Sequence, residues 1–236
     1  MRAQNRPTFT YFGHSTIRCD FPTGEVVLID PWVAQNPACP DELKKIDKID
    51  VMLITHAHFD HCADAVDLAK EHKPLVIGTF ELCAWLESKG VENCSGMNIG
   101  GTQKIPGGKV TQVQALHTSS FSQDDGPIGD HATGYMVTLD SGYTFYHAGD
   151  TTVFMDMQLF ADDYRPALAF LPIGDHFTMN PRQAARACRF LQVRQVIPIH
   201  WGTFPLLTGT PAALKEELAN HGVNTEMIAL NPGEQY

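Results

Sequence analysis

The chain has 236 residues, of which 43% are hydrophobic and 19% are charged, so it can bury a sizeable core. This composition excludes a disordered or a fibrous protein. The net charge is −10 and the 17 Lys and Arg residues form no run, which argues against a nucleic-acid surface and against an anionic membrane surface, because both require basic patches.

No apolar stretch approaches the roughly 20 residues that span a bilayer. Residues 1–10 are polar and lack the apolar centre of a secretory signal peptide, so we expect a cytoplasmic protein. The six cysteines form no CxxC pair, and in a reducing compartment we expect them to be free, buried thiols. The sequence leaves open whether the chain forms a homo-oligomer.

The first half of the chain is rich in predicted strands. Short apolar runs bounded by Gly, Pro, Asp or Asn predict strands over residues 8–12, 16–19, 26–29 and 51–54. A helical pattern follows over 63–71, then a strand over 75–77 and a helix over 80–89, which Gly90 ends.

The second half repeats this order. Strands are predicted over 110–116, 135–139, 143–146 and 168–171, and later over 196–199 and 226–230. The sequence Asn-Pro-Arg-Gln at 180–183 is typical of a capped helix start and predicts a helix to about residue 191, and another helix is predicted over 210–221. We therefore predict one domain over residues 1–236, of class α/β, with two similar halves packed sheet against sheet and helices outside.

A histidine-rich motif, Thr55-His56-Ala57-His58-Phe59-Asp60-His61, directly follows the predicted strand 51–54 and directly precedes a helix. Alternate residues of an extended segment point the same way, so His56 and His58 point together, and the turn into the helix brings Asp60 and His61 beside them. Imidazoles and a carboxylate suit zinc, iron, manganese or nickel, and they would be costly to bury without an ion. The pattern predicts a site for two metals rather than one.

Three further candidate ligands each follow an apolar strand: His117, Asp150 and His200. Loops at one edge of the sheets can bring these residues to the histidine motif.

The HxHxDH motif, in a chain of this length and strand order, resembles the metallo-β-lactamase superfamily. More narrowly, the chain resembles the compact, uncharacterised metal-dependent hydrolases related to L-ascorbate-6-phosphate lactonase. Further landmarks of the resemblance are Gly13-His14-Ser15, Ile29-Asp30-Pro31, His117-Thr118-Ser119-Ser120, Tyr146-His147-Ala148-Gly149-Asp150-Thr151, Leu171-Pro172-Ile173-Gly174-Asp175 and Pro198-Ile199-His200-Trp201.

The resemblance implies a four-layer αββα sandwich and a binuclear metal centre, with zinc as the first expectation and manganese, nickel or iron as alternatives. One metal would take His56, His58 and His117, and the second would take Asp60, His61 and His200. Asp150 would bridge both metals, together with a water or hydroxide. Asp60 and Asp150 would orient this nucleophile and carry its proton.

Several residues keep alternative interpretations. His131 competes with His117 for the first metal, and we favour His117 because it follows a strand, whereas His131 lies in the predicted loop 125–133 and is expected to line the pocket at most. His14 is either a substrate contact or a structural histidine. Asp30 and His147 are expected to support ligands, and Asp175 and His176 are expected at the pocket rim.

The expected function is hydrolysis of a small molecule, with a lactone or another ester-like bond cleaved by the bridging hydroxide. Neither nucleic acid nor membrane is an expected partner. A phosphodiesterase or phosphotriesterase with the same centre, a mononuclear iron dioxygenase of the same fold, and a non-catalytic metal-binding protein are the alternatives.

Overall fold

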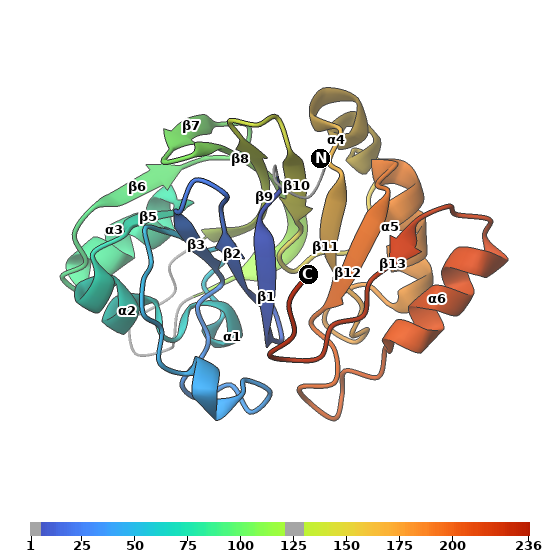
Figure 1. Ribbon diagram of the computed structural model, residues 1–236, viewed down its shortest axis with the longest axis horizontal. Coiled ribbons are helices and arrows are strands. Elements are labelled where there is room, and N and C mark those ends of the chain that lie inside the picture. The colour runs from blue at the N-terminus through green and yellow to red at the C-terminus, as the bar shows by residue number, and fades with distance from the viewer. Residues whose placement is uncertain (1–5, 121–129) are drawn as a thin grey trace.

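Two β-sheets lie face to face in the computed structural model, which describes residues 6–120 and 130–236 (Figure 1). The first sheet has the strand order β1-β2-β3-β4-β5-β6. It is antiparallel from β1 to β3 and parallel from β3 to β6. Its strands are β1 (Thr8–Gly13), β2 (Thr16–Asp20), β3 (Val26–Ile29), β4 (Val51–Leu53), β5 (Leu75–Thr79) and β6 (Cys94–Met97).

The second sheet has the strand order β13-β12-β11-β10-β9-β8-β7. It is antiparallel from β7 to β10 and parallel from β10 to β13. The predicted similarity of the two halves is therefore visible in the strand directions. Its strands are β7 (Thr102–Ile105), β8 (Gly108–Ser119), β9 (Asp130–Leu139), β10 (Thr144–His147), β11 (Leu168–Pro172), β12 (Gln195–Ile199) and β13 (Glu226–Met227).

Helices cover the outer face of each sheet (Figure 1). A short 3-10 turn, Asp41–Leu43, precedes β4. The first sheet carries α1 (Phe59–Cys62), α2 (Ala65–His72) and α3 (Phe80–Ser88), and the second sheet carries α4 (Met157–Tyr164), α5 (Pro181–Leu191) and α6 (Pro211–Asn220). The four-layer αββα sandwich is thus confirmed.

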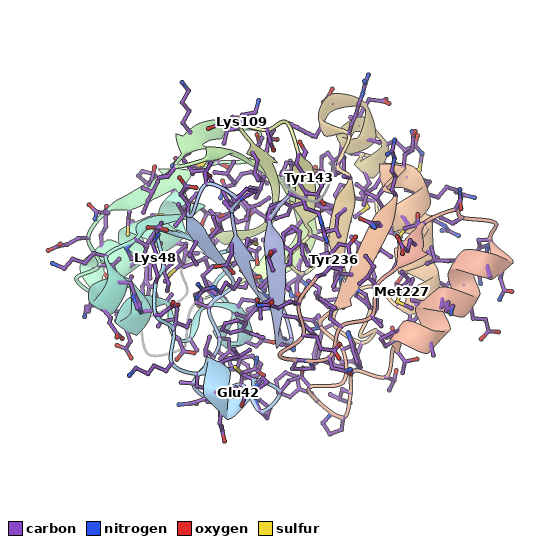
Figure 2. The ribbon with its side chains drawn as sticks, viewed as in Figure 1. Glu42, Lys48, Lys109, Tyr143, Met227 and Tyr236 are labelled. Atoms are coloured by element: carbon purple, nitrogen blue, oxygen red, sulfur yellow. The ribbon has the colours of Figure 1, made fainter. Side chains whose placement is uncertain are left out.

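The central core fills the space between the sheets. Phe9 of β1 packs edge-on against Phe145 of β10 and Phe170 of β11, with ring centroids 5.0 and 5.1 Å away. Tyr143 and Tyr236, labelled in Figure 2, pack against this core. Burying such aromatic surface is the main force that holds two sheets together.

The C-terminal segment is tied to β1. Phe9 and Tyr236 exchange two backbone hydrogen bonds of 2.9 Å, N–H to O in each direction. Figure 1 shows the chain end beside β1 accordingly. Among the described residues, no helix is long and apolar enough to cross a membrane.

The predicted start of α5 is confirmed in atomic detail. Asn180 caps the helix by accepting a hydrogen bond from the Gln183 amide, and the Gln183 side chain accepts one from the Asn180 amide. All six cysteines lie in the described residues and are free, as expected, although Cys94 is only partly buried.

The sequence did not predict β6, β7 or α4. Strand β6 contains Gly96, which is unfavourable in a strand by propensity. A side chain there would place its Cβ 2.8 Å from the Cα of Phe80. The glycine therefore allows α3 to pack closely on the sheet, a tertiary reason that the local pattern does not show.

Candidate metal centre

The histidine motif occupies the connection from β4 to α1. His58 directly precedes α1, in an extended conformation, and the helix itself carries Asp60 and His61. His56 and His61 are fully buried, whereas His58 is partly exposed. The predicted change from extended chain to helix inside the motif is therefore present.

Three histidines gather on one side of this turn. The Nε2 atom of His56 lies 3.0 Å from Nδ1 of His58. The ring of His117 lies across from both, with centroids 5.2 and 5.1 Å away. Their ligand atoms lie within 4.8 Å of one another, so the three residues could hold a metal ion.

Asp150 lies between this group and a second group of histidines. Its Oδ1 atom is 3.3 Å from Nε2 of His61, and its Oδ2 atom is 3.1 Å from Nε2 of His200. Oδ2 is also 3.6 Å from Nε2 of His117 and 4.0 Å from Nε2 of His56. The two oxygens of one carboxylate thus face histidines from both groups.

The second group contains Asp60, His61 and His200, which the resemblance assigns to the second metal, and it also contains His14. Oδ2 of Asp60 lies 3.8 Å from Nε2 of His200 and 3.0 Å from Nε2 of His14. Three segments far apart in sequence therefore meet here, following β1, β4 and β12.

Several buried polar atoms in this cluster have no hydrogen-bond partner among the described residues. They are Nε2 of His61, Oδ1 of Asp150 and both ring nitrogens of His200. A buried polar atom without a partner costs about 1–3 kcal/mol, and Nε2 of His61, Nε2 of His200 and Oδ1 of Asp150 lie together at the Asp150 carboxylate. A divalent cation would satisfy them, so the donor set fits the metal that the sequence predicts.

The pKa shifts of His56 and His61 also suit a metal-binding cluster. Burial lowers the pKa of His56 and keeps its ring neutral, as a metal ligand must be. Burial also opposes protonation of His61, but the carboxylates of Asp150 and Asp30 outweigh it and raise the pKa of His61. These carboxylates attract positive charge, which a metal can supply in place of the proton.

A glycine brings Asp150 close to the motif. Gly149 has φ +59°, and a Cβ there would lie 2.7 Å from the carbonyl oxygen of Thr133 and 2.8 Å from Cβ of Thr55. Only glycine fits this contact, because the region is left-handed and crowded. The turn after β10 therefore packs directly on the segment that precedes His56.

Comparison with known proteins agrees with this geometry. Residues 25–201 match the β-lactamase superfamily domain. A UPF0173 metal-dependent hydrolase of Koribacter versatilis is 50% identical over 208 residues, which are 88% of this chain and 89% of that protein. Another, of Rubrobacter xylanophilus, is 45% identical over 228 residues, covering 96% of this chain and 94% of that protein.

This chain belongs to the UPF0173 metal-dependent hydrolases of the metallo-β-lactamase superfamily. Among solved structures, the metallo hydrolase Igni18 of Ignicoccus hospitalis is similar, with a TM-score of 0.86 and 34% identity over 98% of this chain and 97% of that chain. The recognised superfamily and the enzyme class, a metal-dependent hydrolase, are confirmed. The narrower relation to a lactonase stays a prediction.

Asp30 supports two histidines of the hydrolase at once. Its Oδ2 atom accepts a hydrogen bond from Nδ1 of His61 at 2.8 Å and one from the Thr55 hydroxyl at 2.9 Å. Because the Thr55 hydroxyl donates to Asp30, it accepts from Nδ1 of His56, 3.0 Å away. In both histidines Nδ1 thus donates a hydrogen bond within the protein, so Nε2 faces the centre and is the atom available to a metal.

Asp30→Asn is therefore expected to weaken metal binding by about 10- to 100-fold. The asparagine amide has the size of the carboxylate. Its oxygen carries no full negative charge, so it accepts the hydrogen bonds from His61 and Thr55 more weakly. Competition against a chromophoric chelator measures the metal affinity. Asp67→Asn, at an exposed position of α2, is the matched control, and equal affinity in the two variants would contradict the role of Asp30.

His14 holds Asp60 in place. Burial and the nearby His200 lower the pKa of His14 to about 4, so its ring is neutral. Its Nε2–H donates to Asp60 at 3.0 Å, and its Nδ1 accepts from the Thr203 hydroxyl at 3.0 Å. The structure thus places this histidine beside Asp60 as its hydrogen-bond partner, whereas no sequence pattern singles out Thr203.

His147 lies just outside the cluster and ties two segments together. Its Nδ1 atom accepts from the Gly149 amide at 3.2 Å, so its Nε2–H donates to the carbonyl oxygen of Ser15 at 3.1 Å. Both nitrogens are thus used within the protein. These hydrogen bonds join the turn that carries Asp150 to the segment after β1.

Ser119 is a further supporting residue that the sequence did not single out. Its hydroxyl accepts a hydrogen bond from the backbone amide of Ala57 at 3.0 Å. Ala57 lies between His56 and His58 of the motif. The Ser119 hydroxyl donates to Oδ2 of Asp130 at 2.7 Å. Ser119 could have been found from its position two residues after His117 on β8, because alternate residues of a strand face the same side.

The structure does not bring His131, Asp175 or His176 into the cluster. His131 lies in β9 rather than in a loop and is exposed, because β9 begins at Asp130 and pairs with the end of β8. Asp175 and His176 are exposed in the turn after β11, and they do not line the cavity at the site, whereas the adjacent Phe177 does.

Proposed function

We propose that this chain is a single-domain hydrolase with a binuclear metal centre that cleaves a lactone or another ester-like bond of a small molecule. The observation that carries the proposal is the position of Asp150, whose two carboxylate oxygens face histidines of both groups. A carboxylate shared between two clusters of imidazoles suits a pair of divalent cations, because both donor types bind such ions.

The proposed ligands divide as the resemblance to the metallo-β-lactamase superfamily implies. His56, His58 and His117 would hold the first metal, and Asp60, His61 and His200 would hold the second. Asp150 would be shared by both. When bound, the cations lower the pKa of water and polarise the scissile carbonyl. We propose zinc, and manganese, nickel or iron would also suit these donors.

Two carboxylates serve as the proton-handling groups. Asp60 and Asp150 both line the cavity above the centre, so each can accept a proton from attacking water. Asp60 is 14% exposed at its side chain whereas Asp150 is 3% exposed. We therefore assign transfer of the proton to the leaving group to Asp60, with His14 holding its carboxylate in position.

A metal analysis combined with a substrate panel tests this function. Protein purified with zinc is analysed by mass spectrometry and incubated with lactones, thioesters, phosphodiesters and phosphotriesters. We expect about two ions per chain and turnover of a lactone or ester that a chelator abolishes and zinc restores. Preferred turnover of phosphorus substrates would favour a phosphodiesterase or phosphotriesterase, and one ion with oxygen consumption would favour a mononuclear dioxygenase.

A further inference from the structure

A cavity of about 970 Å³ opens directly over the metal centre. Its floor contains ligand candidates from both groups, among them His58, His117 and His200. Its walls are built by segments from both halves of the chain, α1 and α3 on one side and the turns after β11 and β12 on the other. A substrate held over the centre must therefore contact these walls.

The walls present large apolar side chains to solvent. Phe59 is 61% exposed, Leu206 is 52% exposed and Phe177 is 49% exposed, although each is large and apolar. All three line the cavity, together with Trp85 and Phe204. Apolar surface concentrated at one opening marks a binding surface for an apolar group, because it is costly to leave in water.

One wall is a packed aromatic cluster beside Asp60. Trp32 lies 5.7 Å from Phe59 and 5.8 Å from Phe204 between ring centroids, and Phe59 and Phe204 are 6.4 Å apart. Trp32 itself is buried, so it supports the two lining rings from behind. Rings that contact one another in this way form a firm apolar surface rather than loose side chains.

The cavity offers no cation of its own to an anionic substrate. Among the described residues that line it, none is Lys or Arg, and the only carboxylates are the proposed ligands Asp60 and Asp150. Residues 121–129, outside the described ranges, contain no Lys or Arg in their sequence. Lys89 lies 5.5 Å from the ring centroid of Trp85 but is not a lining residue. Sites that recognise phosphate or carboxylate groups use such side chains.

Resting on the proposed function, we propose that the natural substrate is uncharged and carries an apolar acyl or aryl group beside the bond that is cleaved. The carbonyl lies at the metal centre, and the apolar group lies against Phe59, Phe177, Phe204 and Leu206. A substrate with a phosphate or carboxylate on this group would lose its hydration in the cavity without gaining a cationic partner.

Binding of three hydroxamic acids to the zinc-loaded protein tests this proposal without depending on turnover. Acetohydroxamic acid, octanohydroxamic acid and suberic monohydroxamic acid share one metal-binding group and differ only in the tail. Each buried methylene tightens binding about fourfold. If half of the longer tail is buried, octanohydroxamic acid binds about 50-fold more tightly than acetohydroxamic acid, measured by calorimetry.

The suberic compound has a tail of the same length that ends in a carboxylate, and it is expected to bind at least about tenfold more weakly than octanohydroxamic acid. Equal affinity of these two compounds would overturn the proposal. Equal affinity of the acetyl and octanoyl compounds would also overturn it. Selectivity for the octanoyl tail without turnover of any ester or lactone would instead reject the proposed function and leave the apolar character of the site established.

Substitutions in the cavity walls test whether the octanoyl tail binds there. Phe177→Ser and Leu206→Ser are each expected to lower the octanoyl-to-acetyl affinity ratio about fivefold. Leu159→Ser is the matched control, because Leu159 is 58% exposed on α4 and does not line the cavity. An unchanged ratio in both wall variants would show that the tail binds elsewhere and would overturn the assignment of these walls.

Discussion

Asp150→Asn is expected to lower kcat/KM by about three orders of magnitude and to reduce the metal content from about two ions per chain to one or fewer. The amide replaces one carboxylate oxygen by an NH2 group, which cannot bind a metal. Because the Asp150 carboxylate faces His61 and His200 of the second group and His117 of the first, the variant is expected to hold at most one of the two proposed metals. The variant also removes the negative charge of the Asp150 carboxylate, which would stabilise a metal cation at this buried site.

Mass spectrometry for zinc and kinetics on one substrate of the panel measure both effects. Asp140→Asn, at an exposed position after β9, is the matched control and should keep full metal content and activity. Circular dichroism shows whether the Asp150 variant is folded. A folded Asp150→Asn protein that retains about two ions and near-normal turnover would contradict the bridging role.

The part of the site that could be predicted from the sequence is the part that depends on local geometry. The alternation of an extended segment brings His56 and His58 together, and the start of α1 adds Asp60 and His61. The capped start of α5 is equally local, since Asn180 and its partner lie within one helical turn.

The remainder depends on contacts between distant segments. Strand β8 continues past the predicted end, and its register with β9 shifts between Gln114 and Thr118, so His117 lies within an irregularity that no local pattern specifies. His14, Asp30 and His200 directly follow strands and adopt positive φ values of 57°, 52° and 54°. Such conformations are strained for residues other than glycine and persist only where the surrounding structure enforces them.

The cavity walls illustrate the same limit. The sequence drew attention to Asp175 and His176 because they are polar and follow a buried strand, yet the next residue, Phe177, reaches the cavity. The conformation of that turn determines which side chain reaches the cavity, since Asp175 and His176 both have positive φ. A turn of this kind directs side chains in ways that the order of polar and apolar residues does not encode.

His117→Ala is expected to lose metal affinity by more than about 100-fold and to lose activity with it. His117 supplies the third imidazole of the first group, and two imidazoles hold a cation much less firmly than three. Its ring lies 5.2 Å from that of His56 and 5.1 Å from that of His58, between centroids. Its Nε2 atom is 3.6 Å from Oδ2 of Asp150, so it also contacts the proposed bridge.

His131→Ala is the matched control for this variant, because His131 is the competing histidine and lies in the adjacent strand. In the ladder His131 is paired with Thr118, and among the described residues it belongs to no group that could hold a metal ion, whereas His117 does. His131 is also exposed. Its replacement should therefore leave metal content and turnover of a common substrate near normal, measured by mass spectrometry and kinetics. Metal loss in His131→Ala with full occupancy in His117→Ala would reverse the assignment and give the third imidazole to β9.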